Sequence, residues 1–195
     1  MAREALIKRK TKETDIEIRL NLDGTGKASI STGIGFFDHM LEGFARHGFF
    51  DLTVSCTGDL HVDSHHTIED VGIVLGDAIR EALGDKSGIA RFGYMILPMD
   101  ETLMTCAVDL SGRPYLVFDT HFSGERCGGY DTAMAEEFFY AVSIHAGMNL
   151  HFVQMKGSND HHILEACYKA FAKALDMAVR YDERVTGVLS TKGSL

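Results

Sequence analysis

Residues 63–69 read Asp-Ser-His-His-Thr-Ile-Glu, and residues 159–165 read Asn-Asp-His-His-Ile-Leu-Glu. The two His-His-x-x-Glu motifs begin at His65 and His161, 96 residues apart, which is almost half of a chain of 195 residues. Each motif opens onto apolar residues at helical spacing, so each is predicted to start a long helix. A duplication of this length indicates that the chain is built from two related halves.

The residues around the two motifs predict a similar order of elements in each half. In the first half, the patterns predict strands at 15–22 and after the Asp23-Gly24 turn, a helix at 36–46, a strand at 50–56, and a helix that Gly84 ends. In the second half, they predict strands at 102–110, 115–122 and 149–155, with helices from about Asp131 and Asp160. We therefore predict an α+β fold of two fused ββαβα-type repeats, with helices packed on one face of each sheet.

The composition limits the domain organisation and the partners. No proline-, serine- or charge-rich linker separates the halves, so we predict one domain over 1–195, with repeats at about 1–86 and 92–184 and a C-terminal tail. The net charge of −9 argues against a nucleic-acid or anionic-membrane partner, and the basic run Lys8-Arg9-Lys10 is interpreted as a solvated lead-in. No membrane span or signal peptide is recognised, so we expect a cytoplasmic protein.

Each His-His-x-x-Glu motif combines side chains that bind metal ions. Successive helical residues are about 100° apart around the axis, so adjacent histidines diverge, while the glutamate returns to their face. One motif therefore supplies a His/Glu chelating pair and one histidine free to reach another ion. A single His-His pair could equally be polar residues of a helix start, but the repeated spacing argues against that reading. Two copies predict two metal sites.

Imidazole and carboxylate ligands without thiolate suit Mn, Fe, Co, Ni or Zn. Because one motif supplies at most three ligands, others must come from elsewhere, and His39 in Phe-Phe-Asp-His-Met is the leading candidate. The other five histidines are expected to be bystanders: His47, His61, His121, His145 and His151.

Three glycine-containing segments are candidates for anion binding. Arg91-Phe92-Gly93, Gly112-Arg113-Pro114 and Ser190-Thr191-Lys192-Gly193 put guanidinium, ammonium and hydroxyl groups in predicted loops, where they could hold a phosphate. Taken alone, each arginine is more simply read as a surface or ion-pair residue, and such a tail as frayed.

Six segments carry a family resemblance: Lys-Glu-Thr (12–14), Leu-Asp-Gly-Thr-Gly (22–26), Phe-Phe-Asp-His-Met-Leu (36–41), Asp-Ser-His-His-Thr-Ile-Glu-Asp (63–70), Asp-Leu-Ser-Gly-Arg-Pro-Tyr (109–115) and Asn-Asp-His-His-Ile-Leu-Glu-Ala (159–166). Together they resemble the imidazoleglycerol-phosphate dehydratases, nearly along the whole chain. The resemblance implies a histidine-biosynthesis lyase that converts D-erythro-imidazole-glycerol phosphate to imidazole-acetol phosphate and water. It also implies two Mn²⁺ per active site, or other divalent transition metals, and a 24-subunit homo-oligomer with interfacial active sites.

The resemblance also assigns roles by position. The metal ligands would be His39, His65, His66, Glu69, Glu137, His161, His162 and Glu165. The substrate phosphate would be bound by Arg91, Arg113, Ser190 and Lys192, which makes the C-terminal tail part of the substrate site, and Glu13 would lie near the reacting carbons. Two positions depart from the family pattern: Glu137 stands where many relatives have histidine, and Gly43 where some have a glutamine near the substrate.

The implied reaction explains this ligand set, because it removes a proton from a carbon that no carbonyl activates. Two cations, one at each ring nitrogen of the substrate, would stabilise an imidazolate and let the ring expel the hydroxyl through a diazafulvene-like intermediate. A carboxylate must move the protons, with Glu13 the first candidate and Glu165 the second. Phosphate contacts remote from the ring would position the substrate.

Two other functions fit part of the pattern. A dinuclear metal hydrolase acting on a phosphoester would also use paired metals, and it would release inorganic phosphate. A non-catalytic assembly protein would use the histidine pairs to cross-link subunits through metal, and it would lose its assembly on chelation without ever showing turnover.

Overall fold

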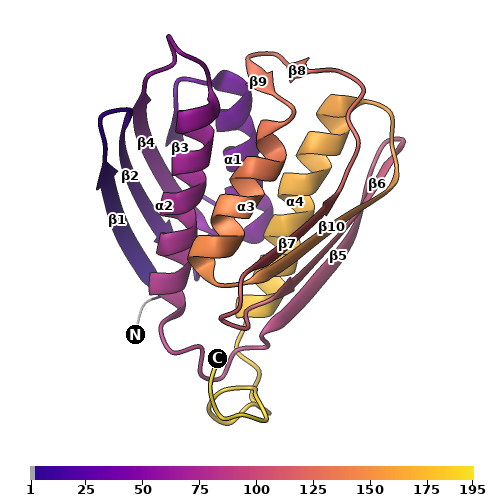
Figure 1. Ribbon diagram of the computed structural model, residues 1–195. Helices are drawn as coiled ribbons and strands as arrows, with labels where there is room; N and C mark the ends of the chain where they lie inside the picture. The colour runs from indigo at the N-terminus through magenta and orange to yellow at the C-terminus, as the bar shows by residue number, and fades with distance from the viewer. Residues whose placement is uncertain (1–2) are drawn as a thin grey trace.

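The computed structural model describes residues 3–195 as two four-stranded sheets with four helices between them (Figure 1). The first half consists of β1 (Glu4–Lys10), β2 (Thr14–Asn21), β3 (Ala28–Ser31), α1 (Gly35–Gly48), β4 (Asp51–Gly58) and α2 (His65–Leu83). The second half consists of β5 (Phe92–Met99), β6 (Thr102–Asp109), β7 (Tyr115–Asp119), β8 (Arg126–Cys127), β9 (Tyr130–Asp131), α3 (Met134–Ala146), β10 (Asn149–Lys156) and α4 (Asp160–Val179). No helix within the described residues is long and apolar enough to cross a membrane.

Both sheets have the same topology. The strand order is β1-β2-β4-β3 in one sheet and β5-β6-β10-β7 in the other. In each sheet the last two strands are parallel and are joined through a helix, α1 between β3 and β4 and α3 between β7 and β10. The second half therefore repeats the first, with the β8–β9 hairpin inserted before α3.

The α+β class is confirmed, and each four-stranded sheet contains one more strand than the sequence patterns indicated. Lys8, Arg9 and Lys10 do not form a solvated lead-in but belong to β1, where Lys8 pairs with Glu17 of β2. Phe92 and Gly93 do not lie in a loop but open β5. Both strands lie at sheet edges, where charged or exposed residues are common and weaken the alternation that reveals a strand.

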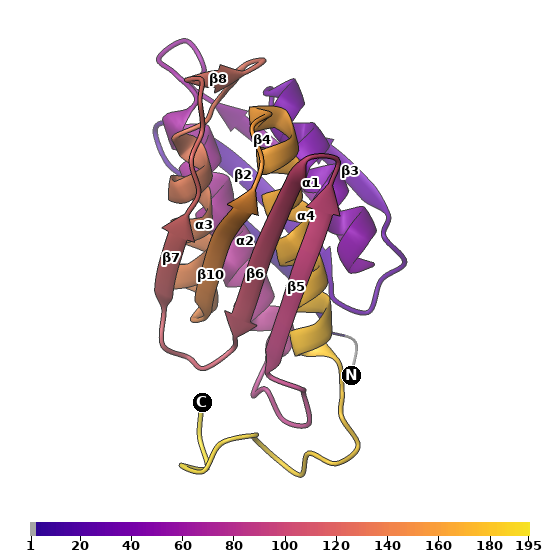
Figure 2. The ribbon, with the colours of Figure 1, turned by 90° about the vertical axis from the view of Figure 1, so that its right-hand side faces the viewer.

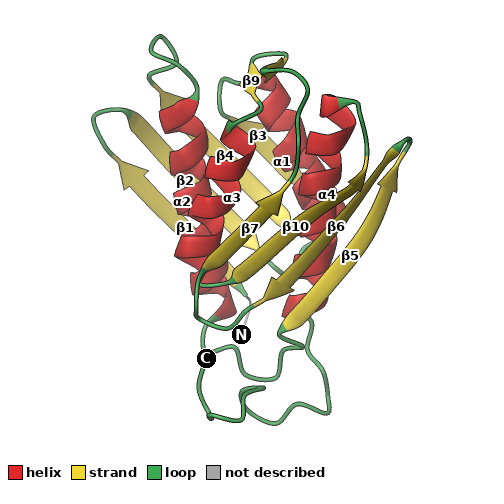
Figure 3. Cartoon of the chain, turned by 45° about the vertical axis from the view of Figure 1, so that its right-hand side comes forward, coloured by secondary structure: helices red, strands yellow, loops and turns green. Residues whose placement is uncertain are grey.

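The helices form a middle layer that both halves share (Figures 1 and 3). On one side α1 packs against α4, where the rings of Phe44 and Phe171 stack with centroids 5.3 Å apart. On the other side α2 packs closely along α3, because Gly72 and Gly76 have no side chains to separate the helices. A Cβ atom at Gly72 would lie 2.8 Å from the Phe138 carbonyl oxygen, and one at Gly76 would lie 2.9 Å from that of Val142. The core therefore runs through both halves.

The direction of the helices fixes which loops share an end of the molecule. All four helices start at the end where the β8–β9 hairpin lies, and the C-terminal tail lies at the opposite end (Figure 1). We call these the helix-start end and the tail end. The turns after β1 and β5 lie at the helix-start end, whereas the turn between β6 and β7 lies near the tail (Figures 1 and 2).

Candidate active site

A polar side chain two residues before the first histidine of each motif accepts a hydrogen bond from the backbone at the helix start. The Asp63 carboxylate accepts a hydrogen bond of 2.8 Å from the His65 backbone N–H, and the Asn159 side chain accepts one of 3.0 Å from the His161 N–H. Such caps satisfy backbone donors that have no partner within the helix. The caps therefore hold both motifs at the helix-start end.

Three of the predicted ligands gather between the two halves. His39 comes from α1, whereas His161 and Glu165 come from α4, and their ligand atoms all lie within 4.8 Å of one another. Opposite ligands of one ion are about 4.2 Å apart, twice a typical metal–ligand distance, so the spacing suits one ion after small side-chain movements. Both histidines are exposed, which leaves room for further ligands. The nitrogen and oxygen donors fit Mn²⁺ or a related divalent ion.

Glu165 is the most buried member of this cluster. Its Oε2 lies 3.2 Å from His161 Nε2, and its Oε1 lies 4.0 Å from His39 Nε2 and 2.7 Å from Lys169 Nζ. Burial raises the pKa of Glu165, but the hydrogen bond from Lys169 and the nearby histidines outweigh it, so its pKa is lowered. An ionised carboxylate held in this way is suited to binding a metal ion and poorly suited to accepting a substrate proton.

The first motif has the same His/Glu pairing, without a third ligand beside it. His65 Nε2 lies 3.4 Å from Glu69 Oε2, one helical turn along α2. Among residues 3–195, only the His39 cluster brings one ligand atom from each of three side chains within 4.8 Å of one another. Glu137 lies on α3, which packs along α2, and it stands nine residues before the last residue of α3, just as His39 stands nine residues before the last residue of α1. Glu137 thus corresponds to His39 in the repeated fold.

The second histidine of each motif turns away from its glutamate and contacts other carboxylates. His66 Nδ1 lies 3.0 Å from Asp59 Oδ2, and His162 Nδ1 lies 2.7 Å from Glu101 Oε2. These hydrogen bonds raise the pKa of both histidines. The bond from His162, together with backbone N–H groups, holds the pKa of Glu101 well below its usual range.

The other nitrogens of these two rings also face carboxylates. His66 Nε2 lies 3.8 Å from Glu13 Oε1, and His162 Nε2 lies 3.6 Å from Asp100 Oδ2. Glu13 and Asp100 lie in the turns after β1 and β5, which correspond in the two halves. The structure therefore brings Glu13, the predicted catalytic residue, to the helix-start end beside His66.

The sequence reasoning missed three acidic residues at this end: Asp59, Asp100 and Glu101. The available signal was the duplication itself, since the predicted repeat could have been searched for a counterpart of Glu13. That search required recognition of β1 and β5, because Glu13 lies in the turn after β1, and Asp100 and Glu101 lie in the turn after β5. Asp59 instead follows β4. Without those strands, Asp100 and Glu101 are two acids in an unassigned segment.

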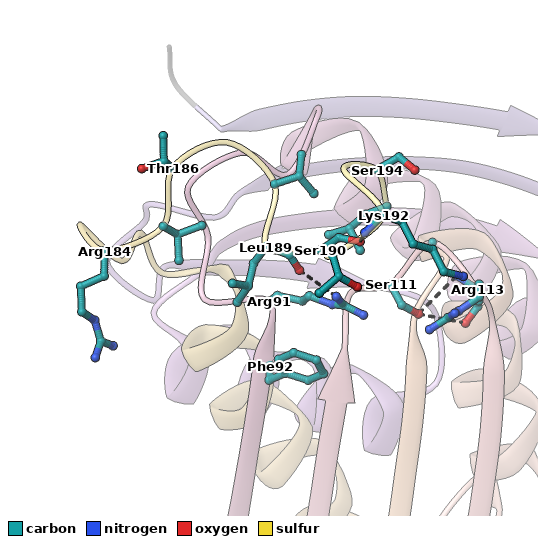
Figure 4. A pocket seen from close by; sticks show the side chains of 15 residues that line it. Arg91, Phe92, Ser111, Arg113, Arg184, Thr186, Leu189, Ser190, Lys192 and Ser194 are labelled. Atoms are coloured by element: carbon teal, nitrogen blue, oxygen red, sulfur yellow. Dashed lines mark hydrogen bonds between the residues drawn. The ribbon is translucent and has the colours of Figure 1, made fainter.

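The predicted phosphate ligands lie together at the tail end. Arg91, Arg113, Ser190 and Lys192 all line one pocket of about 930 Å³, with Arg184 adding another cation (Figure 4). The Arg91 guanidinium is anchored by two hydrogen bonds to Asp109, of 2.7 and 3.1 Å, and by one of 2.7 Å to the Leu189 carbonyl oxygen. Arg113 and Lys192 are exposed. The clustered positive charge makes this pocket, which we call the anion pocket, a candidate site for the substrate phosphate.

The metal-ligand cluster and the anion pocket lie at opposite ends of α4. His161 is in the first turn of α4. The backbone N–H of Arg91 donates to the carbonyl oxygen of Ala178, which lies in the last turn of α4. Seventeen residues separate these positions, which is about 26 Å of helix. One small molecule therefore cannot contact both groups of residues within a single chain.

Comparison with known proteins agrees with the resemblance seen in the sequence. The family model described as imidazoleglycerol-phosphate dehydratase matches residues 32–175. The imidazoleglycerol-phosphate dehydratases of Lachnoclostridium phytofermentans and Acetivibrio thermocellus are 63% and 57% identical to this chain, each over 100% of both chains.

Solved structures show the same similarity. The crystal structure of the Staphylococcus aureus imidazoleglycerol-phosphate dehydratase has a TM-score of 0.81 and 40% identity, covering 91% of this chain and 100% of that one. The Pyrococcus furiosus structure has a TM-score of 0.84 and 38% identity, covering 97% and 100%. The chain therefore belongs to the imidazoleglycerol-phosphate dehydratase family and is an enzyme of that family.

Proposed function

We propose that this enzyme is a manganese-dependent hydro-lyase that converts D-erythro-imidazole-glycerol phosphate to imidazole-acetol phosphate and water in histidine biosynthesis in the cytoplasm. The observation that carries the proposal is the cluster of His39, His161 and Glu165, because its nitrogen and oxygen donors lie close enough together to bind one ion. The ligand set that the family resemblance implies also provides for a second ion, which would be bound by His65, Glu69 and Glu137. His66 and His162 complete the ligand set of the two Mn²⁺ ions.

The protein residues divide the remaining work. Bound at the ring nitrogens of the substrate, the two cations would supply Lewis acidity that stabilises negative charge on the imidazole. Glu13 takes the proton from the carbon that becomes the ketone and returns it to the hydroxyl on the carbon beside the ring, which leaves as water. The enol that remains tautomerises to the ketone. Glu13 is favoured over Glu165 for this step because it is exposed and is not held by a lysine.

Self-association would bring the two ends of different chains together. The anion pocket and the metal-ligand cluster are too far apart to share a substrate within one chain, so we infer that each active site forms between subunits of a homo-oligomer, with 24 subunits as the expected size. The outer face of the second sheet supports this inference (Figure 2). It exposes large apolar side chains, among them Tyr94, Ile96, Tyr115, Val153 and Met155. Such a patch is typical of an interface.

Turnover of the proposed substrate tests the function. Purified protein loaded with Mn²⁺, and shown by light scattering to be assembled, is incubated with imidazole-glycerol phosphate while product absorbance and inorganic phosphate are followed. We expect a phosphate-retaining product whose formation stops on chelation. Release of inorganic phosphate would indicate a hydrolase instead, and assembled, metal-loaded protein without turnover would overturn the proposal.

A further inference from the structure

Glu101 joins the turn after β5 to the start of α4. Its Oε2 atom accepts a hydrogen bond of 2.7 Å from Nδ1 of His162, a residue of α4. Its Oε1 atom accepts hydrogen bonds from the backbone N–H groups of Asn159 at 2.9 Å and Ser158 at 3.2 Å, and from the Thr102 hydroxyl at 3.1 Å. Both carboxylate oxygens are therefore acceptors, and three donors fix one of them.

This arrangement determines which ring nitrogen of His162 carries hydrogen. An ionised carboxylate can only accept, so the Nδ1 atom that faces it must donate, and a neutral ring then keeps the lone pair on Nε2. The nearest charged group to Nε2 is Asp100, whose Oδ2 lies 3.6 Å away, too far for a hydrogen bond. The free lone pair is the electron pair that a metal ion requires from a histidine.

We propose that Glu101 is a positioning residue that holds His162 in the Nδ1–H tautomer and thereby makes Nε2 its metal-binding atom. The inference rests on the proposed function, because it assumes that His162 binds a divalent cation. It goes beyond that function by assigning a role to a residue outside the ligand set. Carboxylates that hold the second nitrogen of a metal-binding histidine typically change metal affinity roughly 10- to 100-fold when they are removed.

Glu101→Gln is a sharp test, because the amide has one acceptor and one donor end. Three donors face Oε1, so the carbonyl oxygen of the glutamine will stay there, and its NH₂ group will face His162 Nδ1. Nδ1 must then accept, which moves the ring hydrogen to Nε2 and removes the lone pair from the metal-binding side. The side-chain volume and the contacts to Ser158 and Asn159 are kept, so the fold should be little affected.

Asp59 provides a matched contrast on the corresponding histidine. Its Oδ1 and Oδ2 atoms lie 3.2 and 3.0 Å from His66 Nδ1, and within residues 3–195 its side chain has no other hydrogen-bond donor. An Asp59→Asn side chain can therefore turn its carbonyl oxygen toward Nδ1 and keep the tautomer. Asp77→Asn is the control outside the ligand set, because Asp77 contacts Nδ1 of the bystander His145 at 3.2 Å.

The experiment measures Mn²⁺ binding to the assembled, metal-free full chain by calorimetry, and the ring tautomer by ¹⁵N NMR of histidine-labelled protein. We expect Glu101→Gln to weaken binding at one class of site roughly 10- to 100-fold and to move the His162 hydrogen to Nε2, with an unchanged melting temperature. Asp59→Asn and Asp77→Asn should change affinity less than about threefold.

Wild-type affinity in Glu101→Gln, or an unchanged His162 tautomer, would overturn the inference. An equal loss of affinity in all three variants would also overturn it, because that result indicates general weakening. Neither readout uses substrate, so a wild-type protein that binds Mn²⁺ without turnover would refute the proposed function and leave the role of Glu101 standing.

Discussion

His39 on α1 faces Glu165 on α4, with Nε2 4.0 Å from Oε1, although the two residues belong to different halves of the chain. The pairing exists because α1 and α4 pack against each other in the shared helical layer. A metal site at this position therefore depends on how the halves dock, and neither half alone contains its three ligands.

Removing one ligand of this cluster should remove the metal but not the fold. Removing a residue that merely holds a histidine ligand typically weakens metal binding roughly 10- to 100-fold. His161→Ala removes a ligand itself, so we expect it to weaken Mn²⁺ binding by more than this and to abolish turnover. His121→Ala is the control, because the His121 side chain is exposed and forms its ion pair with Asp119, which is not a proposed ligand. Calorimetry and metal analysis of dialysed protein measure the effect. Full metal occupancy in His161→Ala would contradict the assigned ligand set.

Glu137 can be tested through its correspondence with His39. Glu137→His should keep both metal ions, because histidine stands at the corresponding position of α1. Glu137→Ala should lower the bound Mn²⁺ from two ions to one per chain, because one ligand of the second ion is lost. Metal analysis after dialysis against a weak chelator distinguishes the outcomes. Two tightly bound ions in Glu137→Ala would exclude Glu137 as a ligand.

The two arginines of the anion pocket should differ in effect. Arg113 is exposed, so Arg113→Ala should lower kcat/KM about 10- to 100-fold, which corresponds to one lost hydrogen bond to a charged group, and leave stability unchanged. Arg91→Ala should lower both kcat/KM and stability, because Arg91 also anchors Asp109 and the tail at Leu189. Steady-state kinetics and thermal unfolding separate the two effects, with Arg80→Ala, an exposed arginine of α2 that pairs with Asp77 outside this pocket, as the control. A normal kcat/KM in Arg113→Ala would exclude its phosphate role.

The apolar outer face of the second sheet should be required for assembly. Ile96 is 54% exposed in the single chain, so a charge at this position would be buried in an interface that covers the face. We expect Ile96→Glu to give smaller particles, measured by light scattering after gel filtration. Thr53→Glu, on an exposed position of the first sheet, should assemble normally. Unchanged assembly in Ile96→Glu would show that another surface holds the subunits together.

The Arg3–Asp23 pair predicts a pH dependence of stability. The hydrogen bond from Arg3 lowers the pKa of Asp23 in the folded chain, so the pair stabilises the fold above the unfolded pKa of about 3.9, and this stabilisation is lost as the pH falls through the folded pKa. Asp23 is half exposed, so Asp23→Asn should lower the free energy of unfolding by only about 1 kcal/mol at pH 7. Urea unfolding at fixed protein concentration should show this difference shrinking at pH 3. A constant difference would contradict the prediction.

Features that depend on local periodicity and repetition could be predicted from the residues alone. The α+β class, most strands and helices, and the placement of both histidine motifs at helix starts follow from spacing and capping residues near each element. The motifs also carried the family, because six ordered segments identify it without knowledge of any distance. The edge strands β1 and β5 were not predicted. The outer backbone groups of an edge strand face solvent, so its residues can be charged or exposed and need not alternate regularly.

Which distant residues contact one another depends on how the helices and sheets pack. His39 joins His161 and Glu165 because α1 packs on α4, and Glu101 reaches His162 because the turn after β5 lies beside the start of α4. The same packing separates the anion pocket from the metal-ligand cluster by the length of α4. These contacts join residues far apart in the chain. Local sequence patterns do not predict them, because they result from how whole helices and sheets pack into one core.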